Sequence, residues 1–99
     1  MKVGTDIVEI ARFEAIDELV LKKMFHPTEL ENRRPQHLAG VLAAKESLMK
    51  IFQGSSFLDF EMIKERTGKP RVITTYPFTG DISISHDGEY AIAVAMQED

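Results

Sequence analysis

The segment that decides the fold is Leu38-Ala39-Gly40-Val41-Leu42-Ala43-Ala44-Lys45-Glu46-Ser47-Leu48-Met49-Lys50. Its spacing predicts a long central helix that begins at His37 or Leu38, after an interruption at Pro35, and ends near Phe52. At about 100° per residue, one side of this helix is an apolar stripe. The stripe consists of Leu38, Val41, Leu42, Leu48, Met49 and Phe52. The other elements should therefore be arranged around this helix.

Three charged residues of the helix can be interpreted in more than one way. Lys45 falls in the middle of the apolar stripe. Its ammonium group either reaches solvent along packed methylenes or meets a buried carboxylate or a ligand phosphate. Glu46 and Lys50 lie one turn apart, on a face with Ala39 and Ala43. They form either a surface pair worth a few tenths of a kcal/mol or a site where small neighbours leave room for a ligand.

A further carboxylate lies in the segment Gly4-Thr5-Asp6-Ile7-Val8-Glu9-Ile10, within a strand predicted from Lys2 to Ile10. Alternation places Asp6 on an apolar face of that strand. A lone charge there is costly unless it is paired or bound to a metal. Oxygen ligands beside a fixed cation suit a magnesium ion that carries a phosphate ester. Asp6 and Glu46 are therefore candidate metal ligands, with Lys50 beside them.

The remaining pattern predicts an α+β fold, in which an antiparallel sheet packs on the long helix and on shorter helices. The shorter helices are expected at residues 12–21, closed by Lys22 and Lys23, and after a capping box at residues 28–31. The strands are expected at residues 60–65, 70–75, 81–86 and 90–96. The last two form a hairpin around Asp87-Gly88. Its serines and alanines predict one nearly bare sheet face, for a closely packed helix or a subunit contact.

Bulk properties narrow the class of protein. The 99 residues suggest one domain, residues 1–99. The net charge of -4 gives no sign of a nucleic-acid binder. The absence of cysteine excludes disulfides and thiolate zinc sites and fits a reducing compartment. No run approaches the ~20 apolar residues that span a bilayer, and Asp6 precedes any secretory apolar run, so we expect a cytoplasmic protein without a membrane segment.

Four collinear motifs together resemble the holo-acyl-carrier-protein synthases, the small bacterial branch of the phosphopantetheinyl transferases. They span nearly the whole chain. The motifs are Gly4 to Ile10 with Arg12-Phe13, Leu38-Ala39-Gly40 leading to Ala43 to Lys50, Gly68-Lys69-Pro70, and Ile82-Ser83-Ile84-Ser85-His86.

The resemblance implies transfer of 4'-phosphopantetheine from coenzyme A to a serine of apo acyl carrier protein, for fatty acid synthesis. It implies Mg²⁺ held by Asp6 and Glu46, with Lys50 supporting the phosphates. Lys45, Lys69 and His86 match positions near the bound nucleotide. Either Glu46 or a metal-polarised water could take the serine proton. Family members of this size are expected to be homotrimers with active sites between subunits.

The sequence departs from the family pattern at three places, one of which is a somewhat short segment between the main helix and the following strand. Val41 and Leu42 stand where the family usually has Arg and Phe, so one positive charge expected to bind a phosphate group is missing. Acidic residues occupy the first helix, where the family offers basic residues to an acidic carrier protein: Glu14, Asp17 and Glu18. Docking is then left to Arg12, Lys22 and Lys23, with Arg33 and Arg34 nearby, and should be weak or selective.

Two other hypotheses remain open on the sequence. A non-catalytic module of the same fold would bind coenzyme A or phosphate without modifying a carrier. A purely structural interaction protein would use Glu46 and Lys50 as a surface pair and bind no nucleotide with magnesium.

Overall fold

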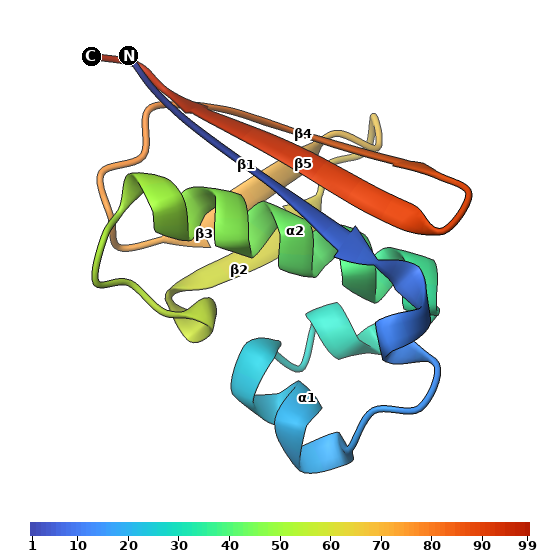
Figure 1. The fold of residues 1–99 in the computed structure, drawn as a ribbon. Coiled ribbons are helices and arrows are strands. Elements are labelled where there is room, and N and C mark those ends of the chain that lie inside the picture. The colour runs from blue at the N-terminus through green and yellow to red at the C-terminus, as the bar shows by residue number, and fades with distance from the viewer.

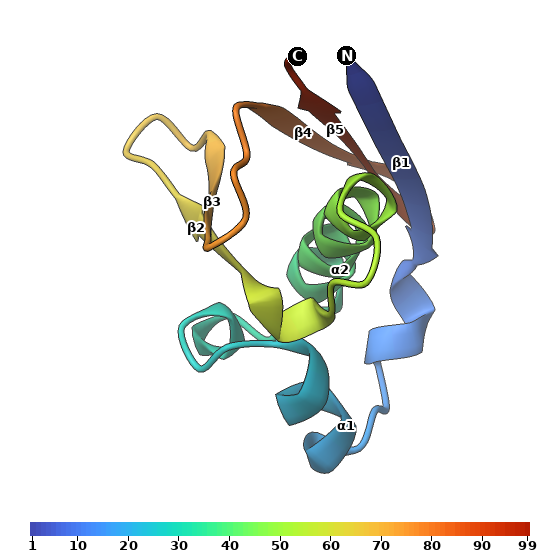
Figure 2. The same cartoon turned by 90° about the vertical axis from the view of Figure 1, so that its left-hand side faces the viewer.

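The computed structural model describes residues 1–99, and its largest sheet is antiparallel and three-stranded (Figure 1). In that sheet, β5 (Tyr90–Gln97) pairs with both β1 (Lys2–Glu9) and β4 (Gly80–Asp87). A separate hairpin consists of β2 (Phe60–Lys64) and β3 (Pro70–Thr74). The long helix α2 (Pro35–Ile51) packs on the large sheet, and β1 and the β2–β3 hairpin lie on opposite sides of it (Figure 2). The α+β architecture expected from the sequence is confirmed.

The contact between α2 and the large sheet depends on small residues. A Cβ atom at Gly4 would lie 2.0 Å from the carbonyl oxygen of Ser47, so β1 can approach the helix only with glycine there. The hydroxyl of Ser47 donates to the carbonyl of Ala93, 3.2 Å away on β5. Ala39 and Ala43 precede Ser47 at steps of four residues and are fully buried. These alanines therefore make room for the sheet and not for a ligand.

The two faces of the β4–β5 hairpin differ from the expectation. Ser83 lies opposite Val94, and Ile84 lies opposite Ala93, so serines share a face with bulky residues and isoleucines share a face with alanines. The alanine face is the buried one, against α2. The other face carries exposed apolar side chains from β1 and β5: Val3, Ile7, Tyr90, Ile92, Val94 and Met96. The prediction of a bare serine and alanine face was wrong, because it assigned the two strands' faces without their register.

The short helices also depart from the prediction. The predicted helix at 12–21 is replaced by a 3-10 turn, η1 (Ile10–Phe13), and a later helix, α1 (Glu18–Met24). Helix α1 begins there because the Asp17 carboxylate accepts a hydrogen bond from the Leu19 N–H, 2.7 Å away. At η2 (Glu29–Glu31) no capping box forms, since Thr28 has helical backbone angles and its hydroxyl donates to Glu61. Pro35 is the first residue of α2 and does not interrupt it, since proline fits the first helical turn.

Aromatic rings attach the β2–β3 hairpin to the C-terminal end of α2. Phe52 lies 5.0 Å from Tyr76 and 6.3 Å from Phe60, measured between ring centroids. Phe60 follows the 3-10 turn η3 (Phe57–Asp59) and opens β2. The cluster therefore fixes where the small sheet stands beside the helix, and with it one wall of the cavity described below.

The two ends of the chain meet at one corner of the large sheet (Figure 1). Lys2 pairs with Gln97, and the amino group of Met1 forms an ion pair with the carboxylate of Asp99. None of the helices has the length and apolar character that crossing a membrane requires.

Candidate active site

Asp6 and Glu46 lie together where β1 crosses the C-terminal half of α2. The face alternation predicted for β1 is confirmed: Gly4 and Val8 are buried on the α2 side, and Asp6 between them is largely covered. Partial burial, hydrogen bonding to Asp6 and the negative charge of Asp6 together raise the pKa of Glu46 to about 7, and burial is the largest of these causes. Two carboxyl groups from different elements therefore lie so close together that the charge of one disfavours ionisation of the other.

This pair fits a bound divalent cation. The Oδ2 atom of Asp6 is buried and has no hydrogen-bond partner, an arrangement that is costly for a carboxylate. A hard cation such as Mg²⁺ takes oxygen ligands and would satisfy this atom while removing the repulsion that raises the pKa of Glu46. The donor set is thus suited to magnesium, with Asp6 and Glu46 as the residues that could hold it.

Two cations stand beside the carboxylates. The Lys50 ammonium group donates to the Thr5 carbonyl at 2.5 Å and lies 3.4 Å from Asp6 Oδ1. The positive charges of Arg12 and Lys50 both lower the pKa of Glu46, although less than burial and Asp6 raise it. Arg12 lies in η1, directly after β1, so it belongs to the carboxylate site by position as well as by charge.

Lys45 does not belong to this site. Its ammonium group is fully buried, 2.6 Å from Glu29 Oε1 and 2.7 Å from the Met24 carbonyl oxygen. Glu29 also accepts hydrogen bonds from the backbone N–H groups of His26 and Met62, both at 2.7 Å. The family resemblance predicts Lys45 near a bound nucleotide, and in the structure its ammonium group is held in this buried network. Of the two readings of its position, the buried carboxylate is the right one.

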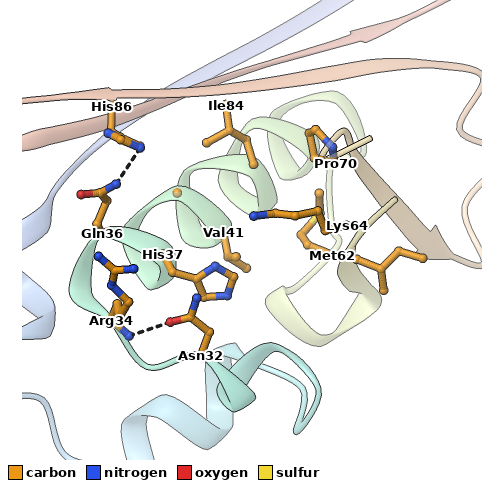
Figure 3. A pocket seen from close by; sticks show the side chains of 13 residues that line it. Asn32, Arg34, Gln36, His37, Val41, Met62, Lys64, Pro70, Ile84 and His86 are labelled. Atoms are coloured by element: carbon orange, nitrogen blue, oxygen red, sulfur yellow. Dashed lines mark hydrogen bonds between the residues drawn. The ribbon is translucent and has the colours of Figure 1, made fainter. Parts of the chain in front are cut away.

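A cavity of about 330 Å³ opens on the other side of α2, between the N-terminal half of the helix and the β2–β3 hairpin (Figure 3). Its lining includes basic side chains from three separate parts of the chain: Arg34, His37, Lys64 and His86. Apolar side chains complete it, among them Val41, Met62 and Ile84. No carboxylate lines it. A cavity with basic and apolar walls is suited to an anionic ligand that also has a flat apolar part.

His86 and Lys69, predicted near a nucleotide, lie in and beside this cavity. The Nε2 atom of His86 lies 2.7 Å from the side-chain nitrogen of Gln36, the second residue of α2 (Figure 3). Lys69 is exposed in the turn before β3, and its ammonium group is 3.1 Å from Asp81 Oδ2. Gly68 and Pro70, on either side of it in sequence, line the cavity. His86 therefore has direct access to a ligand in the cavity, and Lys69 stands at its edge.

The carboxylate site and the cavity lie on opposite sides of α2 (Figure 2). Asp6 belongs to β1 and the cavity to the β2–β3 side. In the large sheet, β1 and β4 are the two outer strands, so Asp6 and His86 are held at opposite edges. An α-helix with its side chains is about 10–12 Å thick. One small ligand cannot reach both halves directly through the helix of a single chain.

The predicted docking residues are divided between two places. Lys22 and Lys23 are exposed in the last turn of α1 and form no ion pair, whereas Arg12 lies at the carboxylates. Next to α1, Arg33 is engaged by Glu18 through two hydrogen bonds, of 2.6 and 2.9 Å. Lys22 and Lys23 are thus the free cations of this surface.

The polar cavity residues that the sequence did not single out include Gln36, His37 and Lys64, and Arg34, expected near the docking residues, lines the cavity instead. Lys64 is the last residue of a strand, and nothing in its local sequence distinguishes it from a solvated surface lysine. Only the packing of the hairpin beside α2 brings it opposite Val41. A signal in the sequence existed only for Gln36, because a polar residue just after a helix-opening proline often faces solvent or a ligand.

Comparison with known proteins assigns the whole chain to one family. The profile of the 4'-phosphopantetheinyl transferase superfamily matches residues 2–95. The chain therefore belongs to the 4'-phosphopantetheinyl transferase superfamily. It is 37% identical to the holo-[acyl-carrier-protein] synthase of Chlorobaculum tepidum, over 99% of this chain and 98% of that protein. It is 34% identical to that of Acholeplasma laidlawii, over 97% and 94%.

Solved structures agree with this assignment. The holo-[acyl-carrier-protein] synthase of Helicobacter pylori in complex with coenzyme A matches with a TM-score of 0.86 and 28% identity, over 98% of this chain and 100% of that one. The Bacillus anthracis synthase in complex with CoA (3',5'-ADP) matches with a TM-score of 0.84 and 30% identity, over 94% and 91%. The sequence-based identification as a holo-acyl-carrier-protein synthase, an enzyme, is confirmed.

Proposed function

We propose that residues 1–99, acting as one domain, transfer 4'-phosphopantetheine from coenzyme A to a serine of apo acyl carrier protein, in a Mg²⁺-dependent reaction that supplies fatty acid synthesis. The observation that carries the proposal is the half-buried pair of Asp6 and Glu46, with the pKa of Glu46 raised to about 7. Such a pair is poorly explained by folding alone and is suited to a cation that carries a pyrophosphate.

In this reaction a bond forms between the serine oxygen and the phosphorus of the phosphopantetheine group. The bond from that phosphorus to adenosine 3',5'-bisphosphate breaks, and the serine proton passes to Glu46 or to a water. Mg²⁺ bound by Asp6 and Glu46 would neutralise charge on the phosphates. Lys50, already held at the Thr5 carbonyl and Asp6, adds a fixed positive charge beside them. Because substrates of this kind react largely through positioning and charge stabilisation, these residues supply what the chemistry needs.

The nucleotide half of coenzyme A is assigned to the cavity lined by Arg34, Lys64 and His86. Its volume of about 330 Å³ and its apolar wall at Val41 and Ile84 suit a nucleoside. Its basic side chains suit a phosphate group. Because residue 41 is valine, α2 lacks the arginine expected from the family. Arg34 and Lys64 bring positive charge to the same cavity from other parts of the chain.

The proposal includes a homotrimer with active sites between subunits. Two observations support it. The nucleotide cavity and the carboxylates lie on opposite sides of α2, so a second copy could bring its cavity to the first copy's carboxylates (Figure 2). The outer face of the large sheet exposes Ile7, Ile92 and Val94 together, an apolar surface typical of a subunit contact.

The direct test mixes the protein with apo acyl carrier protein, coenzyme A and Mg²⁺ and measures the mass of the carrier. We expect a gain equal to one phosphopantetheine on serine. Asp6→Ala and Glu46→Ala should lose transfer by orders of magnitude and remain folded, while the exposed acid Glu65, changed to Gln, serves as a charge-matched control. No gain with several different carriers would overturn the proposal. Tight coenzyme A binding without any gain would instead support the non-catalytic module.

A further inference from the structure

The surface around α1 contains an ion pair that the proposed reaction does not use. The Arg33 guanidinium binds Glu18 through both of its outer nitrogens, at 2.6 Å and 2.9 Å. Both side chains are about half exposed. The hydrogen bond from Arg33 is the main reason that the pKa of Glu18 lies below its usual range. Glu18 thus holds the guanidinium in the two-point geometry by which arginine recognises carboxylates.

Arg33 stands at the edge of a shallow hollow of about 400 Å³ between α1 and η2. Phe25, Pro27 and Leu30 give the hollow an apolar floor, and Lys22 flanks it with a second cation. One carboxylate, that of Glu31, also lines the hollow, so two cations face one acid there. A partner segment that fits this surface presents an apolar side chain with carboxylates beside it. An acidic carrier protein has this chemistry, so the inference that follows rests on the proposed function.

The acids of this region play different parts. The Asp17 carboxylate is used in capping α1, and Glu18 is used in holding Arg33. Glu14 is exposed and takes part in no ion pair or side-chain hydrogen bond. Removing the charge of Glu14 therefore frees no cation, whereas removing the charge of Glu18 frees Arg33.

We propose that Glu18 is an intramolecular competitor of the carrier protein for Arg33. A carboxylate of the incoming carrier has to replace Glu18 on the guanidinium, while Lys22 is available without any exchange. The carrier's affinity is lowered by the stability of the Glu18–Arg33 pair. A carrier whose carboxylates reach only Arg33 should therefore bind more weakly than one whose carboxylates also reach Lys22. In this way Glu18 selects among carriers by the positions of their negative charges.

The test compares Glu18→Gln with Glu14→Gln, which removes the same charge a few residues away. The dissociation constant of apo carrier protein is measured by calorimetry, and KM and kcat are measured in the transfer assay. We expect Glu18→Gln to tighten carrier binding about two- to five-fold, in line with the small worth of exposed ion pairs. The KM for carrier should fall equally, while kcat and the KM for coenzyme A stay unchanged. Thermal unfolding confirms that each variant is folded.

A double-variant cycle isolates the pair. In an Arg33→Ala background, Glu18→Gln should no longer change carrier binding, because no guanidinium remains to be released. The inference is overturned if Glu18→Gln leaves binding unchanged or weakens it, if Glu14→Gln has the same effect, or if the effect persists without Arg33. The binding measurement does not depend on transfer. Carrier binding that responds to Glu18 without any transfer would therefore contradict only the proposed reaction.

Discussion

The carboxyl group of Glu46 links proton binding to the stability of the fold. Its pKa is about 7 in the folded chain, compared with ~4.3 in an unfolded one. Metal-free folded protein therefore keeps a proton between roughly pH 4.5 and 7 that the unfolded chain has lost. The stabilising contribution of this group is fully present below about pH 4.5 and is lost as the pH rises through 7.

We expect the free energy of unfolding of the metal-free protein to decrease from pH 5 to pH 8 more steeply than that of Glu46→Gln. Urea unfolding at several pH values measures both, and the comparison removes the titration of the other groups. Magnesium should restore stability at pH 8 in the wild-type chain only, since a metal binds the deprotonated carboxylate. Identical pH slopes in the two proteins would contradict the assignment of a shared carboxylate site.

Lys64 and Arg34 allow a second test at the level of single residues. If the cavity holds the nucleotide half of coenzyme A, Lys64→Ala and Arg34→Ala should each raise the KM for coenzyme A about ten-fold, the loss expected for one charged hydrogen bond. The KM for dephospho-coenzyme A, which lacks the 3'-phosphate, should change much less. Arg71→Ala on the neighbouring strand is the matched control. Equal losses with both substrates would place the phosphate elsewhere.

Lys45 illustrates what the sequence could not decide. Its place in the apolar stripe was visible, and the two open alternatives included the right one. The choice depended on Glu29, which lies 16 residues earlier and was assigned to a capping box. Periodicity predicts which residues share a face of one helix, but it contains no information about which distant acid is buried against that face.

At the level of elements, the contact between β1 and α2 is what brings Asp6 to Glu46. Gly4→Ala would place a Cβ atom 2.0 Å from the Ser47 carbonyl oxygen, a backbone atom that cannot turn away. The strand has to move off the helix, and we expect a loss of about 1–3 kcal/mol or more in the free energy of unfolding.

Transfer activity in Gly4→Ala should fall further than stability alone explains, because Asp6 moves together with the strand. Activity measured at a temperature where the variant remains folded separates the two effects. Gly54→Ala serves as a control for destabilisation away from the site: a Cβ atom there meets nothing within 4 Å, but the φ of +86° strains the backbone of any other residue. Full activity in folded Gly4→Ala would show that the distance between the carboxylates is not critical.

The strands and the central helix were predictable because each has strong periodicity of its own. The region between residues 10 and 35 was predicted less well, because short 3-10 turns are stabilised by caps and tertiary contacts more than by an apolar pattern. Asp17 was placed inside the first helix and is instead the residue that caps the N-terminus of α1. The carboxylate half of the site was found from the sequence, since both acids stand out in apolar surroundings. Of the cavity half, only His86 and Lys69 were predicted, from the family resemblance, because the walls of the cavity come together only in the fold.

At the level of the whole molecule, the separation of the two half-sites by α2 predicts complementation between subunits. Glu46→Gln removes one half, and Arg34→Ala with His86→Ala removes the other. Mixed after unfolding and refolding together, the two inactive proteins should recover a substantial fraction of wild-type transfer, because some interfaces then combine two intact halves. Each protein refolded alone is the control. No recovery in verified mixed oligomers would indicate that each chain uses both of its own halves.

The ion pair between the two chain ends has a consequence for how the molecule folds. β1 and β5 pair along their whole length although they lie at opposite ends of the chain, so their contact closes a very long loop. A circular permutant that joins Asp99 to Met1 through a short glycine linker and opens the chain at Gly54 would turn β4, β5 and β1 into a continuous meander. Its sheet contacts become local in sequence, and refolding should accelerate in stopped-flow measurements as the contact order falls. In the natural order, β1, the edge strand that carries Asp6, is synthesised before β5 and can pair with it only after β5 has been synthesised.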